Sequence, residues 1–187
     1  MRDERRSSRL LAVLAVGLIS LIGPISPIGP TACAWTARKT LPPVGPDWVL
    51  RATKRLATHE LWKEHDGGDH IYIERGCLSE TMSDYRHRSR PWTIRCSAFD
   101  QSRPEGARSL FQYYHGGVEN EVREVERIGE ATYLWKSATA RAWGVGFCKG
   151  RFFVEASLVE EGEAGAPLSD SARRALLEFA RRLAAAL

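Results

Sequence analysis

The sequence lacks the motifs that identify several classes of hydrolase. It contains no Gly-x-Ser-x-Gly turn, which positions the nucleophilic serine of many hydrolases. It contains no His-Glu-x-x-His motif, which places two zinc-binding histidines on one face of a helix. No internal repeat and no heptad pattern runs along the chain. We therefore expect a non-catalytic protein without a cofactor, and the alternative of an enzyme stays open at this stage.

A long apolar run is also missing, although a short one lies near the start. The first nine residues carry four arginines, residues 10–23 are apolar, and a Pro-rich stretch ends in Ala32-Cys33-Ala34. The apolar run is too short to span a bilayer comfortably, and the three parts together predict a signal peptide over residues 1–34. A lipid anchor at Cys33 and an uncleaved anchor are the alternatives. We expect a secreted, periplasmic or cell-envelope protein.

The charge of the chain is not strongly biased toward either sign. The formal net charge is +4, and the predicted signal peptide carries four arginines against two acidic residues, so the remainder is nearly balanced. This balance, together with secretion, argues against a nucleic-acid partner. The partner we expect is an unknown protein or envelope component, and contact with the membrane is expected only through the signal sequence or a lipid anchor.

Residues 35–47 read as a Pro-rich linker, and residues 48–187 as a single α+β domain. A short helix is expected over residues 59–65, with Thr58 as its cap. Longer helices are expected after Ser102 and after a cap at either Ser169 or Asp170. The expected strands are listed in chain order: a short one opening at Trp48, then 78–88, 92–99, 119–128, 131–136, 139–147 and 151–158. Tight turns between them predict a largely antiparallel sheet of about six strands with helices packed on it.

Successive residues of a strand point to opposite faces of the sheet, so the sequence of each expected strand predicts which residues share a face. In the strand at 92–99, one face is apolar and the other carries Thr93, Arg95 and Ser97. In the strand at 139–147, the small residues Gly144 and Gly146 share one face, which predicts that another group packs closely against them.

Three cysteines follow the predicted signal peptide, so one disulfide and one free thiol are expected outside the cytoplasm. If the hairpin turn is centred on residues 89–90, Cys96 lies opposite about residue 83. Cys77 is then about 20 Å away along the strand, which is too far for a disulfide. This favours a pair between Cys77 and Cys148, with Cys96 as a small buried apolar residue.

Several short motifs resemble an uncharacterised bacterial envelope family, a domain of unknown function. They are Leu61-Trp62-x-x-x-Asp66-Gly67-Gly68 followed by Tyr72, the strand segment Ser83-Asp84-Tyr85, the helix from Ala107 to Tyr114 and the hairpin from Lys149 to Val154. The resemblance covers about residues 48–187. It implies an envelope location and this type of fold, and it implies no activity.

The stretch His59 to His70 contains three of the five histidines of the chain. His65, Asp66, Asp69 and His70 surround a Gly-Gly turn and are of the types that bind zinc or another divalent ion. A metal-binding protein or metal-dependent hydrolase that uses these four residues is therefore the alternative function. The resemblance does not support it, because the family usually has other residues at positions 65, 69 and 70. The simpler interpretation is a helix end with a structural turn.

The segment from Tyr85 to Trp92 is the one basic cluster flanked by aromatic residues. It predicts either an anion contact or a solvated hairpin tip whose charges prevent edge pairing. The binding surface that we expect for a partner or ligand combines this tip with the Gly-Gly turn. Its residues are Asp66, Gly67, Gly68, Tyr72, Arg86, Arg88 and Arg90.

Overall fold

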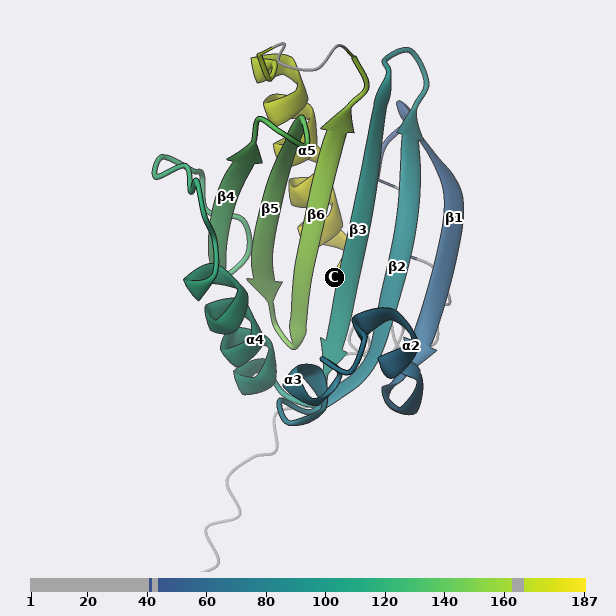
Figure 1. Cartoon of the computed structure of the whole chain (residues 1–187), viewed down its shortest axis with the longest axis vertical. Helices are drawn as coiled ribbons and strands as arrows, with labels where there is room; N and C mark the ends of the chain where they lie inside the picture. Colours follow the sequence, from purple (N-terminus) through teal and green to yellow (C-terminus); the bar gives the residue numbers. More distant parts are fainter. Residues whose placement is uncertain (1–40, 42–43, 163–166) are drawn as a thin grey trace, which may run out of the picture.

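The computed structural model describes residues 41, 44–162 and 167–187, and in this part of the chain six strands form one antiparallel sheet (Figure 1). The strand order is β1-β2-β3-β6-β5-β4, so each half of the sheet is a meander and the two halves join between β3 and β6. The strands are β1 (Trp48–Ala57), β2 (Cys77–His87), β3 (Trp92–Gln101), β4 (Ala131–Ser137), β5 (Ala142–Lys149) and β6 (Phe152–Glu160). The predicted α+β fold with an antiparallel sheet of about six strands is confirmed. The predicted signal peptide, with Cys33, and most of the predicted linker lie outside the described residues.

Helices cover the two faces of the sheet unequally. The long helix α5 (Asp170–Ala186) packs on one face, where it meets β5 and β6 over the main apolar core. The other face, which we call the α4 face, carries α4 (Pro104–Gly116), the short helices α2 (Trp62–His65) and α3 (His70–Ile73), and the 3-10 turn Thr58–Glu60. In Figure 1 these elements lie over the lower ends of the strands, and no helix of the described part of the chain covers the upper part of that face. Within the described residues, no helix is both long and apolar enough to cross a membrane.

The two long helices form where the sequence predicts them. Ala107, Leu110 and Phe111 of α4 are buried, as are Ala172, Leu176 and Leu183 of α5. The backbone N–H of Ala172 donates to the Ser169 side chain, so Ser169 is the cap of α5 among the two expected candidates, Ser169 and Asp170. The predicted cap of α4 is wrong by one residue, because Arg103 takes that position and Pro104 opens the helix.

Two predicted elements differ from the structure. Residues 119–128 do not form a strand, because only Glu121 makes a bridge to β4 and Asn120 adopts a positive φ of 58° that interrupts extended pairing. Conversely, β1 is ten residues long rather than a short strand at Trp48. The predicted helix over residues 59–65 is split into the 3-10 turn and α2. Thr58 does not cap it, since the Thr58 hydroxyl donates to the carbonyl of Cys77.

The cysteines do not form the predicted disulfide. Cys96 lies opposite Ser83, as the hairpin argument predicts, and it is fully buried. Cys77 is on β2 and Cys148 is on β5, with β3 and β6 between them. Three strand spacings are about 14 Å, whereas disulfide α-carbons lie within about 7 Å. All three cysteines are therefore free thiols in the core, and burial raises the pKa of Cys77 and of Cys148 to about 12.

Candidate functional site

The His59–His70 stretch does not bring its acidic and histidine side chains together. The Nε2 atom of His65 lies 2.7 Å from Oε2 of Glu80 on β2, whereas Nδ1 of His70 contacts the Gly67 carbonyl at 3.2 Å. Asp66 ends α2 in the left-handed conformation, with a φ of 43°. Across the described part of the chain, no three His, Cys, Asp or Glu residues are grouped as metal ligands. The local structure is that of a helix end and a structural turn.

A buried polar cluster lies beneath α2, α3 and α4. Tyr72 is only 4% exposed, its ring stacks on Phe99 at 4.8 Å, and its hydroxyl is hydrogen-bonded to that of Tyr114. The side chain of Glu80 is 1% exposed, and its Oε2 atom contacts Nε2 of His65. These contacts attach the short helices to the sheet, so Tyr72 cannot contribute to a binding surface as predicted.

Glu155 on β6 is the second mostly buried carboxylate of the α4 face. The hydroxyl of Tyr133 donates to Glu155 Oε1 at 3.2 Å. Burial raises the pKa of the Glu155 carboxyl above its ordinary value, and the hydrogen bond from Tyr133 only partly opposes that change. Glu155 therefore marks the boundary between the helix-covered part of the α4 face and its open part.

The open part of the α4 face is defined by the register of the strands. Residues that lie directly opposite each other in neighbouring antiparallel strands point to the same face, so successive pairs form a row across the sheet. The row just above Glu155, which we call the Trp135 row, contains Trp135, Gly144, Ser157, Arg95, Asp84 and Ala52. The next row outward contains Val159, Thr93 and Arg86. Among the described residues, no helix covers either row (Figure 1).

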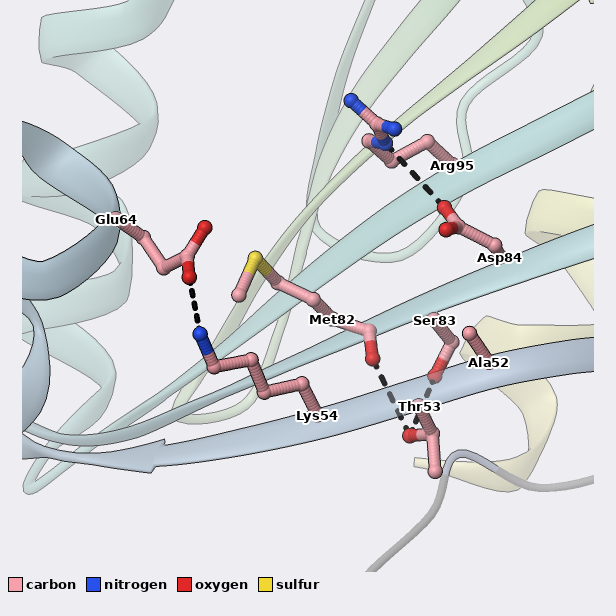
Figure 2. Close-up of a pocket in the computed structure, with 8 residues that line it drawn as sticks. All are labelled: Ala52, Thr53, Lys54, Glu64, Met82, Ser83, Asp84 and Arg95. Atoms are coloured by element: carbon pink, nitrogen blue, oxygen red, sulfur yellow. Dashed lines mark hydrogen bonds and ion pairs between the residues drawn. The ribbon is translucent and has the colours of Figure 1, made fainter.

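Two adjoining hollows occur on this open surface. The first, which we call the arginine hollow, has a volume of about 370 Å³. It is lined by Arg51, Asp84, Arg86, Thr93, Arg95, Ser157 and Val159. The second has a volume of about 290 Å³ and lies between the same sheet surface and Glu64 of α2. Figure 2 shows its lining, in which Lys54 pairs with Glu64, and Asp84 pairs with Arg95. Asp84 and Arg95 line both hollows and connect them into one surface.

Positive charge predominates in the arginine hollow. Its lining contains three arginines and one carboxylate, that of Asp84. The Arg95 side chain is 75% exposed, and its Nε lies 3.3 Å from Oδ1 of Asp84. The Arg86 side chain is 56% exposed, and its Nη1 lies 3.9 Å from Oε1 of Glu161, which is 53% exposed. Such exposed pairs are weak and are readily exchanged for a ligand. The guanidinium groups are therefore available to an anion.

The three predicted tip arginines have different roles. Arg86 points into the arginine hollow. Arg88 donates from Nε to the carbonyl of Pro46, and Arg90 lies over the Trp92 ring at 5.5 Å, so both hold local structure. His65, two residues before the Gly-Gly turn, contacts Glu80, and Glu80 is six residues along β2 from Arg86, which is about 20 Å. The turn and the tip do not form the single surface that we predicted from the sequence.

Sequence reasoning missed Arg51, Asp84 and Ser157 as members of this surface. Part of the signal was present, because the strand alternation had already placed Thr93 and Arg95 together on one face. The remaining members come from strands whose pairing is not visible in the local sequence. Comparisons with known proteins add no assignment: no protein-family model matches the chain, and no curated protein matches it in sequence. The resemblance to an envelope family stays a prediction.

Proposed function

We propose that this protein is a non-catalytic binding domain of a secreted or envelope protein, and that it binds an anionic ligand on the open part of the α4 face. The observation that carries this proposal is the convergence of Arg51, Arg86 and Arg95 on one hollow from three different strands. Side chains of equal charge repel each other and gain nothing from this proximity in the unliganded protein. A bound carboxylate or phosphate group offsets the repulsion.

The chemistry of the lining supports an anion in particular. Arginine presents several N–H donors in a planar fork that matches the oxygens of a carboxylate or phosphate. The hydroxyls of Thr93 and Ser157 lie in the same lining and supply further donors. Asp84 lies 3.3 Å from Arg95 Nε and adds a carboxylate acceptor to the lining. The site therefore combines charge with directed hydrogen bonds, which a solvated hairpin tip does not require.

The metal-dependent alternative has no comparable support. His65 is held by Glu80, His70 faces a backbone carbonyl, and neither lines the two hollows.

The test is binding of the purified full chain to inorganic polyphosphate and to polygalacturonate at low ionic strength, measured by isothermal titration calorimetry. One variant replaces the three hollow arginines, Arg51, Arg86 and Arg95, with alanine. The matched control replaces Arg103, Arg123 and Arg174, which are exposed, lie outside both hollows and remove the same charge.

We expect the hollow variant to bind at least about tenfold more weakly, because the loss of a few charge-assisted hydrogen bonds exceeds 1.4 kcal/mol. The control variant should change affinity less than about twofold, and added salt should weaken binding by the wild-type chain. Equal losses in the two variants would show that only net charge matters and would refute the site. Absence of binding to both polyanions would refute the function.

A further inference from the structure

An aromatic platform adjoins the arginine hollow in the same row of the sheet. A Cβ atom added to Gly144 would lie 1.9 Å from Cε2 of Trp135 and 2.3 Å from its Nε1. The indole therefore lies directly against the backbone of Gly144, and the ring of Tyr133 lies in the same way against Gly146. This confirms the prediction that a group packs closely on the two glycines.

The Trp135 ring lies against the backbone of Gly144 and packs at the margin of the apolar cluster of the α4 face. Trp135 remains partly exposed, so part of the ring is open to a ligand. The absence of a side chain at position 144 lets the ring lie against β5, and Ser157 on β6 is the next member of the row. A flat apolar surface is thereby placed beside a polar one.

The distances along the row suit one ligand that contacts both parts. Gly144, under the indole, and Arg95 are separated by two strand spacings, which is about 10 Å. Between them lies Ser157, whose hydroxyl both donates and accepts hydrogen bonds. A ligand that lies along the row thus meets a ring face, then a hydroxyl, and then the guanidinium and carboxylate pair of Arg95 and Asp84.

We infer that the anionic ligand is an acidic carbohydrate, one of whose sugar rings lies on Trp135 while its carboxylate or phosphate occupies the arginine hollow. This inference rests on the proposed function. Sugar rings have an apolar C–H face that stacks on an indole, and hydroxyls that need partners able to donate and to accept. The Trp135 row supplies an aromatic face, a hydroxyl, a guanidinium and a carboxylate in that order.

An acidic peptide fits the same surface less well. Peptides bind sheets mainly through backbone hydrogen bonds to an exposed edge strand, with pockets for alternate side chains. The hollow lies on the face of the sheet, over β1, β2, β3 and β6, and only Arg51 of its lining comes from the edge strand β1. Its lining contains one apolar side chain, Val159, so it offers no series of apolar pockets.

The experiment compares four polymers by isothermal titration with the full chain. Polygalacturonate carries carboxylates on sugar, phosphomannan carries phosphates on sugar, polyglutamate carries carboxylates on peptide, and polyphosphate carries charge without sugar. Trp135→Ala tests the platform, and Trp135→Leu keeps an apolar group over Gly144 but removes the flat ring. Trp62→Ala is the matched control, since Trp62 is 58% exposed on α2 and does not line the hollows.

We expect the chain to bind one of the two acidic glycans most tightly. Tighter binding of polygalacturonate would identify the acid group of the ligand as a carboxylate, and tighter binding of phosphomannan would identify it as a phosphate. Both Trp135 variants should weaken glycan binding about tenfold, because each removes the flat ring on which the sugar stacks. The two Trp135 variants should change the affinity for polyphosphate by less than about twofold. Trp62→Ala should change neither the affinity for the glycans nor that for polyphosphate. If polyglutamate binds as tightly as the glycans and Trp135→Leu has no effect, the carbohydrate inference fails although the anion site stands. If no polyanion binds, the proposed function fails as well.

Discussion

The Nε2 atom of His65 lies 2.7 Å from Oε2 of Glu80, and this contact joins the end of α2 to the second strand of the sheet. The Glu80 side chain is 1% exposed and its other oxygen, Oε1, is buried without a hydrogen bond among the described residues. The histidine is thus the principal partner of a carboxylate that lies away from water. It serves the fold of the α4 face rather than a metal centre.

Replacing His65 with alanine should therefore destabilise the protein substantially. The change leaves the Glu80 carboxylate buried without its partner, which costs about 2–4 kcal/mol. His70→Ala is the matched control, because His70 is exposed and should change the free energy of unfolding by less than about 0.5 kcal/mol. Urea denaturation of the two variants measures the difference. Equal effects of the two substitutions would be inconsistent with a structural role for His65.

Gly144→Ala should be destabilising although it adds only a methyl group. The new Cβ would lie 1.9 Å from Trp135, so the indole must move away from its place on β5. Overpacking of this kind costs about 1–3 kcal/mol. Gly116→Ala, at the end of α4, meets nothing within 4 Å and should be neutral or stabilising by up to about 1 kcal/mol. Thermal unfolding of both variants tests this, and a harmless Gly144→Ala would show that the ring does not occupy this position.

Glu155→Gln should stabilise the protein at neutral and alkaline pH. Because burial raises the pKa of Glu155 in the folded state, its stabilising effect is complete below the ordinary value of 4.5 and is lost as the pH rises through the folded-state pKa. A neutral glutamine removes the cost of the buried charge. The variant should therefore exceed the wild type in free energy of unfolding at pH 8, and the gain should disappear as the pH falls below about 4.5. A gain that is larger at pH 4 than at pH 8 would contradict this sign.

The three core thiols should resist modification in the native protein. Cys77, Cys96 and Cys148 are buried and unpaired, and burial raises the pKa of each thiol, so almost no thiolate is present at pH 8. A thiol reagent should modify none of them until the chain is unfolded, and then all three without prior reduction. Mass spectrometry of the labelled peptides provides the count. If Cys77 and Cys148 require a reductant before labelling, the two form the disulfide that the sequence suggested.

The sequence predicts the parts of the fold that depend on local pattern. The helix stripes of α4 and α5, the Ser169 cap and the position of Cys96 opposite Ser83 all follow from spacing within one helix or one hairpin. Residues 119–128 have a similar local pattern, but tertiary structure leaves them outside the sheet except for one bridge.

The candidate site could be predicted only in part, because it depends on pairing between distant strands. Arg95 and Ser157 are adjacent only because β3 and β6 pair, and no local motif encodes that pairing. His65 and His70 show the converse case, in which closeness in sequence wrongly suggested a shared site. They are close in sequence, yet a helix end and a turn direct their side chains to different partners.

The most direct test of the account is to locate the anion site without choosing variants in advance. The isotopically labelled full chain is titrated with inorganic phosphate, and amide and arginine Nε–Hε shifts are followed by NMR spectroscopy. The account predicts that the largest saturable shifts occur at Arg51, Arg86, Thr93, Arg95 and Ser157, the lining of the arginine hollow. Shifts centred elsewhere, for instance in the hollow beside Lys136 and Asp170, would contradict it, as would the absence of saturable shifts at the three arginines.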